Sequence, residues 1–323
     1  EEQPLIGESG ALLETLERVS AAAELNRPVM IVGERGTGKE LIAERLHFLS
    51  PRWDQPLVKL NCAAISESLL ESELFGHEAG AFTDAASRRI GRFEQADGGT
   101  LFLDELATTS SAVQEKILRI IEYGEFERLG SSHTLSIDVR VIGATNEDLP
   151  TLAAAGHFRH DLLDRLSFDV ITLPPLRERT EDVLPLAEHF AMRMSRELGR
   201  ELFAGFSDAA IRQMQAHQWP GNVRELKNAV ERAVYRHDTP ARPLGTLQLD
   251  PFDSPWRPAS RSDDAETGPQ TLPHDLRAWL DGRERAVVER ALVEAGGNRR
   301  HAATRLGLSY DQLRGILRKH ALY

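Results

Sequence analysis

Short apolar segments alternate with amphipathic ones over the first half of the chain. An apolar run at 28–32 predicts a buried strand, and similar runs at 57–60 and 139–143 predict two more. After the first run, apolar side chains recur at the spacing of one helix face, at Leu41, Ile42, Leu46 and Leu49. Strands that alternate with helices are typical of a parallel sheet with crossover helices, so we expect an α/β subdomain over residues 1–172.

The pattern becomes helical after Pro174 and Pro175, which interrupt regular structure. Amphipathic spacing extends from 181 to 236, with a break near Trp219. This spacing predicts a smaller helical lid subdomain over 173–238.

A proline-rich stretch separates this lid from the end of the chain. Residues 239–273 contain seven prolines together with Ser, Asp and Gly. Apolar residues are too sparse there to pack a core, so we expect a linker. Residues 274–323 then predict a compact helical domain. A chain of 323 residues with 41% hydrophobic content is long enough for several such cores.

A glycine-rich loop follows the first predicted strand and precedes the first predicted helix. It fits the pattern G-x-x-x-x-G-K with the residues Gly33, Glu34, Arg35, Gly36, Thr37, Gly38 and Lys39. Glycines let backbone N–H groups approach phosphates, the helix N-terminus adds partial positive charge, and Lys39 can reach the terminal phosphates. The loop therefore predicts an ATP site, and a chance glycine loop is the alternative.

The apolar run that ends in Asp104 and Glu105 argues against a chance loop. Asp104 is expected to hold Mg²⁺, and Glu105 to polarise the water that attacks the nucleotide. Glu40 stands where such loops usually carry the Ser or Thr that binds the metal, so Mg²⁺ must depend on Asp104 and water.

A glycine-flanked hexapeptide lies between the two halves of this site, and it reads Gly80, Ala81, Phe82, Thr83, Asp84 and Ala85. Together with the run at 73–78, it resembles the bacterial enhancer-binding proteins, the AAA+ activators of sigma-54 RNA polymerase, whose signature hexapeptide is G-A-F-T-G-A. The resemblance implies an AAA+ ATPase core with a helical lid, in which this mobile loop contacts the sigma factor. The family also commonly carries Glu at the position of Glu40.

Asp84 is the main departure from the family's hexapeptide. Asp tolerates the backbone angles of Gly poorly, and its carboxylate repels acidic surfaces. We expect ATP hydrolysis to survive this change, whereas coupling to the promoter complex is the step that it affects. A second loop at 128–133 is expected to support the first.

The resemblance assigns further residues to the nucleotide. Asn61 matches the position that hydrogen-bonds the catalytic glutamate, although it could equally just end a strand. Asn146 matches the sensor of the γ-phosphate. The lid motif at 221–226 places Arg224 on the nucleotide as the second sensor.

Two arginines, Arg159 and Arg165, lie six residues apart on a predicted helix. Guanidinium groups supplied by a neighbouring subunit stabilise the charge on a transferring phosphoryl group. Pairing with Asp161 or Asp164 on the same helix is the ordinary alternative. In the family the matching arginines act in trans, and this implies a hexameric ring.

The C-terminal domain is basic although the chain has a net charge of −11. Between 298 and 323 six Lys and Arg residues face a single Asp, which gives +5. An apolar seam, a turn at Gly307 and a cap at Ser309 predict a helix-turn-helix that binds DNA, with a plain helix pair as the alternative. We expect DNA contacts from Arg299, Arg300, Ser309, Tyr310, Gln312, Arg314, Arg318 and Lys319. The segment is similar to the family's Fis-type domain, which dimerises and binds palindromic enhancers.

No stretch of the sequence approaches a membrane-spanning helix, and the first residues lack an export signal, so we expect a cytoplasmic, nucleoid-associated protein. The single cysteine, Cys62, cannot form an internal disulfide, and a small buried side chain is its simplest interpretation.

The glycine-rich loop begins at residue 33, so we expect control by a separate protein. The arrangement resembles the activators of phage-shock operons, which implies inhibition by the coiled-coil repressor phage shock protein A. Trp53 is a candidate docking residue for this repressor, and packing under its own loop is an equal alternative. Two rival functions are an AAA+ DNA-binding regulator that no longer engages sigma-54 because of Asp84, and a ring motor that remodels DNA or protein.

Overall fold

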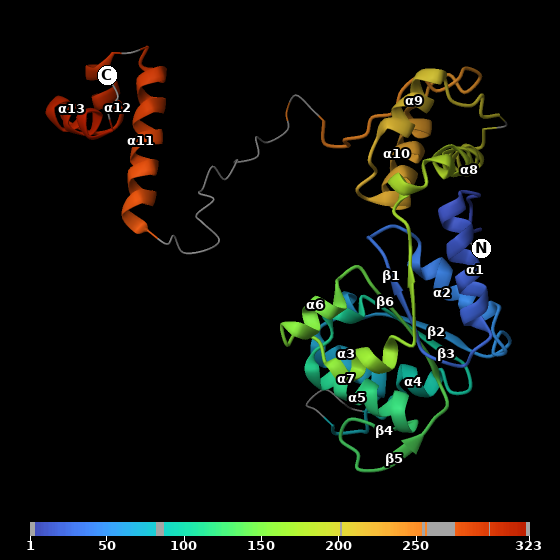
Figure 1. The fold of residues 1–323 in the computed structure, drawn as a ribbon. Helices are drawn as coiled ribbons and strands as arrows, with labels where there is room; N and C mark the ends of the chain where they lie inside the picture. Colours follow the sequence, from blue (N-terminus) through green and yellow to red (C-terminus); the bar gives the residue numbers. More distant parts are fainter. Residues whose placement is uncertain are drawn as a thin grey trace. The chain divides into compact units, whose positions relative to one another are not determined.

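The computed structural model describes residues 4–81, 87–200, 202–253, 256, 275–296 and 298–320. The chain divides into two compact units, Glu1–Pro251 and Phe252–Tyr323. Figure 1 shows the fold of each, with the first unit in blue to orange and the C-terminal unit in red.

A five-stranded sheet organises the first unit. Its strands are β1 (Val29–Val32), β2 (Leu57–Asn61), β3 (Thr100–Asp104), β6 (Arg140–Thr145) and β7 (Asp169–Thr172). They lie in the order β2-β3-β6-β1-β7, and every neighbouring pair is parallel. The three strands predicted from apolar runs are β1, β2 and β6, so the expected parallel α/β fold is confirmed.

One helix, α1 (Gly10–Ala23), precedes β1, and further helices connect the strands as crossovers. The connecting helices are α2 (Lys39–Phe48), α3 (Glu67–Phe75), α4 (Arg92–Gln95), α5 (Ser111–Tyr123), α6 (Leu149–Ala154) and α7 (His160–Leu166). Four short 3₁₀ segments are η1 (Cys62–Ala64), η2 (Leu106–Thr108), η3 (Leu176–Glu178) and η4 (Thr180–Asp182). A separate hairpin is formed by β4 (Glu125–Glu127) and β5 (Thr134–Ser136).

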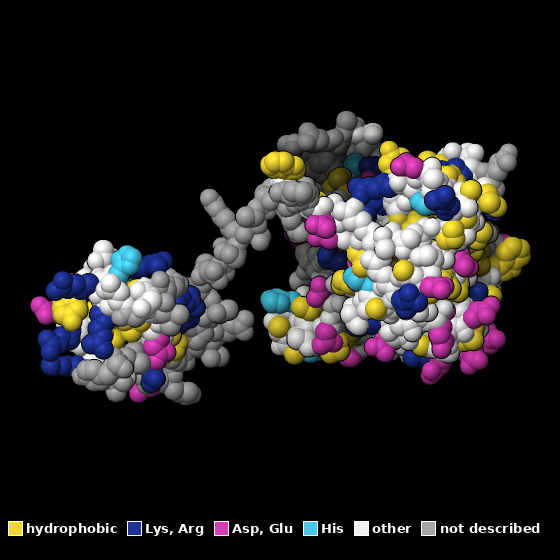
Figure 2. Space-filling view, turned by 90° about the horizontal axis from the view of Figure 1, so that it is seen from above, with side chains coloured by type: hydrophobic (Ala, Val, Ile, Leu, Met, Phe, Trp, Pro, Cys, Tyr) yellow, Lys and Arg dark blue, Asp and Glu magenta, His cyan; other side chains and the backbone are white. Residues whose placement is uncertain are grey.

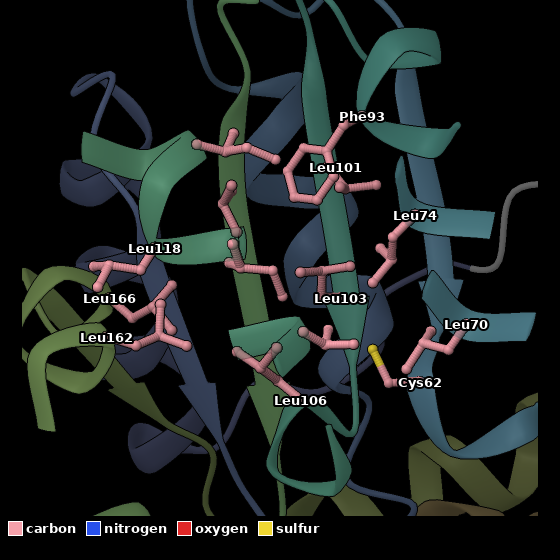
Figure 3. Packing of buried hydrophobic residues seen from close by; sticks show 14 of the residues in the cluster. Cys62, Leu70, Leu74, Phe93, Leu101, Leu103, Leu106, Leu118, Leu162 and Leu166 are labelled. Carbon is pink, nitrogen blue, oxygen red and sulfur yellow. The ribbon is translucent and has the colours of Figure 1, made fainter. Parts of the chain in front are cut away.

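The two faces of the sheet pack separate cores, because successive side chains of a strand point to opposite faces. Leu101 and Leu103 of β3 pack with side chains of α3, α5 and α7, as Figure 3 shows. Phe102, between them, packs on the other face against α1 and α2. This alternation fixes the register of β3, because a slip of one residue would exchange the two faces.

The lid contains α8 (Val183–Glu197), α9 (Asp208–Ala216) and α10 (Asn222–Arg236). Trp219 lies in the predicted break before α10, where it is 1% exposed and donates its indole N–H to the carbonyl of Met214 at 2.8 Å. The break in the helical pattern therefore supplies a core side chain of the lid.

The lid core extends further along the chain than the composition indicated. Leu244 and Leu247 are buried in it, although residues 239–273 were expected to be linker throughout. The backbone of Leu244 bonds to Gly205 and Ser207, and the amide of Gln213 pairs with Leu247. Two leucines that pack on an existing core need no periodic pattern of their own, so their burial could not be predicted from the composition of this stretch.

The second unit consists of α11 (Leu276–Glu294), α12 (Arg299–Arg305) and α13 (Tyr310–Lys319). Gly307 has a φ of 67° in the turn between α12 and α13, a left-handed conformation that glycine adopts without steric cost. The hydroxyl of Ser309 accepts a hydrogen bond from the backbone N–H of Gln312 and caps α13. Among the helices in the described ranges, none is long and apolar enough to cross a membrane.

Leu103→Ala should lower the free energy of unfolding by about 2–5 kcal/mol, because it removes a side chain that is fully buried and leaves a cavity. Urea denaturation followed by circular dichroism measures the change. Leu25→Ala is the control, since Leu25 is 49% exposed, and it should cost about 0.5 kcal/mol or less. Equal losses in both variants would contradict the described core.

Candidate functional site

Three adjacent strands end at one edge of the sheet. Because β6 lies between β1 and β3, the segments that follow these strands meet at their carboxyl ends. The glycine-rich loop follows β1, Glu105 follows β3, and Asn146 follows β6. In open parallel sheets, ligands bind at this edge. The topology thus brings together residues that are far apart in the sequence.

The glycine-rich loop wraps around its own lysine. Gly36 and Gly38 have φ values of 79° and 102°, which glycine adopts easily. The ammonium of Lys39 lies 3.0 Å from the carbonyl oxygen of Gly33 and 3.4 Å from that of Glu34. Burial lowers the pKa of Lys39, while the nearby carboxylates of Glu105 and Asp104 act in the opposite direction. A buried cation at a helix N-terminus is suited to bind an anion.

The acidic pair at the end of β3 is held in a defined geometry. Glu105 has a φ of 53°, an unusual conformation for a residue with a side chain. Its backbone N–H donates to Asp104 at 3.0 Å. The side-chain amide of Asn146 is satisfied when its nitrogen faces Glu105. In this orientation the nitrogen donates to the two carboxylate oxygens of Glu105 at 2.6 and 3.1 Å.

Asn61 has a different partner from the one that the resemblance implied. Its amide nitrogen donates to Asp104 at 3.2 Å, and its oxygen accepts from the backbone N–H of Ala63 at 2.9 Å. The amide that contacts Glu105 is that of Asn146 instead. The guanidinium Nε of Arg35 lies 4.0 Å from Glu105 and is mostly exposed.

Glu40 points to Lys59, whose ammonium bonds to both Glu40 at 2.9 Å and Glu44. Burial lowers the pKa of Lys59, but the hydrogen bonds that its ammonium donates to the two carboxylates outweigh this effect, so the pKa is raised. Glu40 is therefore engaged on the surface of α2.

The lid contacts the glycine-rich loop directly. The backbone N–H of Val223 donates to Gly36 at 3.0 Å, and Cβ of Arg224 lies 3.0 Å from the position that a Cβ on Gly36 would occupy. Sequence reasoning identified Arg224 but missed Asn222, which is fully buried with a φ of 52°. Its place in the lid motif was visible in the sequence, but its conformation was not.

The two arginines expected to act in trans, Arg159 and Arg165, lie on the surface and are paired within their own chain. Arg159 bonds to Asp161 at 2.7 and 3.0 Å, and this hydrogen bond raises the pKa of Arg159. Arg165 bonds to Glu122 at 2.8 Å with its side chain 60% exposed. Carboxylates of the same subunit, Asp161 and Glu122, are thus their partners in the isolated subunit.

The hexapeptide lies partly beyond the described residues. Gly80 has a φ of 83° and is exposed, and Ala81 is half-buried. Phe82, Thr83, Asp84 and Ala85 fall outside the described ranges.

The base of the loop is described, and it joins the second loop. His77 pairs with Arg89 and also with Leu129, whose backbone N–H donates to Gly76 at 3.0 Å. Arg128 is 9% exposed and bonds to Glu78 at 2.8 Å. It also bonds to Glu94, at 2.8 Å through Nε. The two loops therefore share a base built from backbone pairs and a buried guanidinium.

All eight residues expected to contact DNA are exposed in the C-terminal unit. Lys and Arg side chains gather on this unit in Figure 2. The guanidinium of Arg300 lies 5.9 Å from the centre of the Tyr310 ring. Lys319 is engaged within the unit, with its ammonium 2.6 Å from Asp281 and 2.7 Å from Glu284.

Trp53 is 61% exposed, and Phe48 and Leu49, a few residues earlier in the chain, are 52% and 46% exposed. Exposed aromatic side chains are enriched at surfaces that bind other proteins.

Three family models match successive parts of the chain. The model described as "Sigma-54 interaction domain" matches residues 5–172. "AAA+ ATPase lid domain" matches 177–254, and "Bacterial regulatory protein, Fis family" matches 280–320. The first match covers the sheet with its glycine-rich loop and acidic pair.

Curated relatives match almost the whole of this chain. The chain is 54% identical over 318 residues to the Psp operon transcriptional activator of Escherichia coli K12, phage shock protein F, and the match covers 98% of each protein. It is 43% identical over 313 residues to the Nif-specific regulatory protein of Azotobacter vinelandii, covering 97% of this chain and 58% of that one. The sequence resemblance is thereby confirmed.

Solved structures of NtrX from Brucella abortus have the same fold. The complex with ATP aligns at a TM-score of 0.69 with 34% identity, covering 98% of this chain and 69% of NtrX. The complex with ADP aligns at 0.70 with 33% identity, covering 99% and 69%.

These matches do not favour the rival regulator or the ring motor. The chain belongs to the family of sigma-54-dependent transcriptional activators, which combine an AAA+ ATPase with a Fis-type DNA-binding domain.

Proposed function

We propose that this activator serves a phage-shock operon, where it binds an enhancer and uses ATP hydrolysis in a hexameric ring to open the sigma-54 RNA polymerase complex. The observation that carries this proposal is the meeting of Lys39, Glu105 and Asn146 at one sheet edge, in a chain that matches the Psp operon activator from end to end. Its cellular place is the cytoplasm, at the nucleoid.

Lys39 and the backbone N–H groups of residues 33–39 bind the phosphates of ATP. Glu105 accepts the proton of the attacking water, and Asn146 holds the two carboxylate oxygens in place. The left-handed conformation of Glu105 supports this role, because strained residues concentrate at active sites. Arg224 contacts the phosphates from the lid, and its contact with Gly36 supports this position.

Mg²⁺ neutralises the phosphate charge when it is bound. Asp104 fits as its carboxylate ligand, because carboxylate oxygens suit Mg²⁺ and because Glu40 is engaged with Lys59. Asn61 orients Asp104 through its hydrogen bond.

Arg159 and Arg165 act on the γ-phosphate of a neighbouring subunit. Their position on the surface supports this role, since ion pairs at the surface contribute little to stability and each arginine can exchange its carboxylate partner for a phosphate. Such an exchange requires the ring.

The hexapeptide transmits the state of the nucleotide to the sigma factor through Phe82 and Thr83. The shared base with the second loop supports this role, because Arg128 and Leu129 bind the segment on which the hexapeptide is mounted.

The C-terminal unit dimerises and binds enhancer DNA through the exposed residues of α12 and α13. Lys319 stabilises the packing of α13 on α11 in this proposal, because Asp281 and Glu284 already bind it. Phage shock protein A inhibits the ATPase unit through Trp53, whose exposure supports the docking.

Glu105→Ala should reduce kcat for ATP hydrolysis by about 10²–10⁴-fold while nucleotide binding is retained, because only the base is lost. Lys39→Ala should instead lose binding. Nucleotide fluorescence titration and phosphate release measure the two properties. Wild-type turnover in Glu105→Ala would refute the assignment.

Mixing Arg165→Ala chains with Glu105→Ala chains should yield more ATP hydrolysis than either variant alone. Some interfaces of a mixed ring then combine an intact base with an intact arginine. Turnover is measured on rings shown to be mixed by differently tagged chains. If mixed rings form without any gain, Arg165 does not act in trans.

Thr83→Ala should hydrolyse ATP and bind DNA normally but fail to open a sigma-54 promoter, because the contact residue is remote from the phosphate chemistry. Permanganate footprinting of the promoter with sigma-54 polymerase measures opening. Thr239→Ala is the control, since Thr239 is an exposed threonine that follows α10, and this variant should open the promoter normally.

Asp84→Gly restores the family's glycine and its backbone freedom, so it should open the same promoter at least as well as the parent chain. If the parent and Asp84→Gly both fail while ATPase activity and DNA binding are intact, the proposal of promoter opening is wrong.

A further inference from the structure

The glycine-rich loop carries an acidic side chain that the lid side of the molecule binds. Arg177, in η3, donates to both carboxylate oxygens of Glu34, at 2.7 and 3.0 Å. The side-chain amide of Asn222, at the start of α10, donates to the same carboxylate at 3.1 Å. A bidentate arginine contact fixes the orientation of a carboxylate as well as its charge.

Asn222 also joins the two segments that bind Glu34. Its side-chain oxygen accepts from the backbone N–H of Leu176 at 2.8 Å, and its nitrogen donates to the carbonyl of Arg35 at 3.0 Å. It is fully buried, so all these polar groups are satisfied inside the protein. Its left-handed backbone is a conformation that Asn tolerates better than most residues.

Contacts from the lid side extend along the loop. Beyond the bonds to Glu34 and Arg35, the backbone N–H of Val223 donates to Gly36 at 3.0 Å. Arg179, which is 5% exposed, donates to the carbonyl of Thr37 at 3.1 Å. Four consecutive loop residues are therefore bonded by residues 176–179 and 222–223.

The negative charge of Glu34 affects the binding of a nucleotide. A carboxylate within a phosphate-binding loop repels the phosphates of ATP and ADP unless a cation is paired with it. The hydrogen bonds from Arg177 and Asn222 lower the pKa of Glu34, so the carboxylate is ionised at neutral pH. Arg177 supplies the compensating positive charge.

We propose that Glu34, Arg177 and Asn222 form a latch between the lid and the phosphate loop, in which Arg177 is a positioning residue that neutralises Glu34 and so sets the affinity for nucleotide. This inference rests on the proposed binding of phosphates by residues 33–39. The latch links the position of the lid to the charge of the loop, because a displaced Arg177 leaves Glu34 unpaired beside the phosphates.

The test compares Arg177→Gln, Glu34→Gln and the double variant in the full chain. Arg177→Gln should raise the Kd for a fluorescent ADP and the KM for ATP by roughly tenfold, with kcat within about threefold of wild type, because the unpaired charge acts on binding. Glu34→Gln in the same chain should restore both constants to within about threefold of wild type. The defect of Arg177→Gln should shrink as salt rises from about 0.05 to 0.5 M.

Arg177→Lys keeps the charge and should bind ADP within about threefold of wild type. Arg285→Gln is the matched control, since Arg285 is an exposed arginine paired with Glu289 at 2.9 Å in the C-terminal unit, and it should change neither constant. If Arg177→Gln binds the fluorescent ADP with wild-type affinity, the latch proposal is wrong. A double variant no better than Arg177→Gln also overturns it, because a merely structural role predicts no rescue by removing a negative charge.

Lys39→Ala separates this inference from the proposed function. If Lys39→Ala loses binding of the fluorescent ADP while Arg177→Gln binds it normally, only the latch is wrong. If Lys39→Ala binds it normally, the proposed phosphate site is wrong and the latch falls with it.

Discussion

Parallel pairing of β6 with both β1 and β3 is the constraint on which the candidate site depends. The pairing places the phosphate loop, the acidic pair and Asn146 at a common edge, although more than a hundred residues separate Lys39 from Asn146. Two hydrophobic cores, one on each face, hold the sheet in a single register. The packing of the two cores therefore fixes the positions of the residues at the edge.

Directional bonds act within this edge, between the edge and the lid, and at the base of the hexapeptide loop. Asn146 donates to Glu105 at the edge, and the lid reaches Gly36 through Val223. At the base of the hexapeptide loop, Arg128 binds Glu78. Each of these connections consists of a few directional bonds at the ends of rigid elements. Such bonds can exist in alternative arrangements, whereas close-packed cores resist deformation, so movements driven by nucleotide should concentrate at these connections.

Charged residues at the surface pair with one another in the isolated chain. Arg165 binds Glu122, and Arg159 binds Asp161. Ion pairs at the surface contribute little to stability, so exchanging one such partner for a phosphate costs little. The buried guanidinium of Arg140 is different, because it bonds to backbone carbonyls of Ala22, Ala23 and Arg27 and fixes α1 to the sheet.

Apolar periodicity, glycine spacing and capping residues act locally, so they were enough to predict the α/β fold, the loop from Gly33 to Lys39, the acidic strand end and the capped helix-turn-helix. The partner of each side chain followed only from the packing. The packing gave Asn61 to Asp104 and Asn146 to Glu105, buried Leu244 and Leu247 in the lid, and engaged Lys319 within its own domain. A side chain's partner depends on which distant elements the packing brings within hydrogen-bond reach, and no local pattern records that distance.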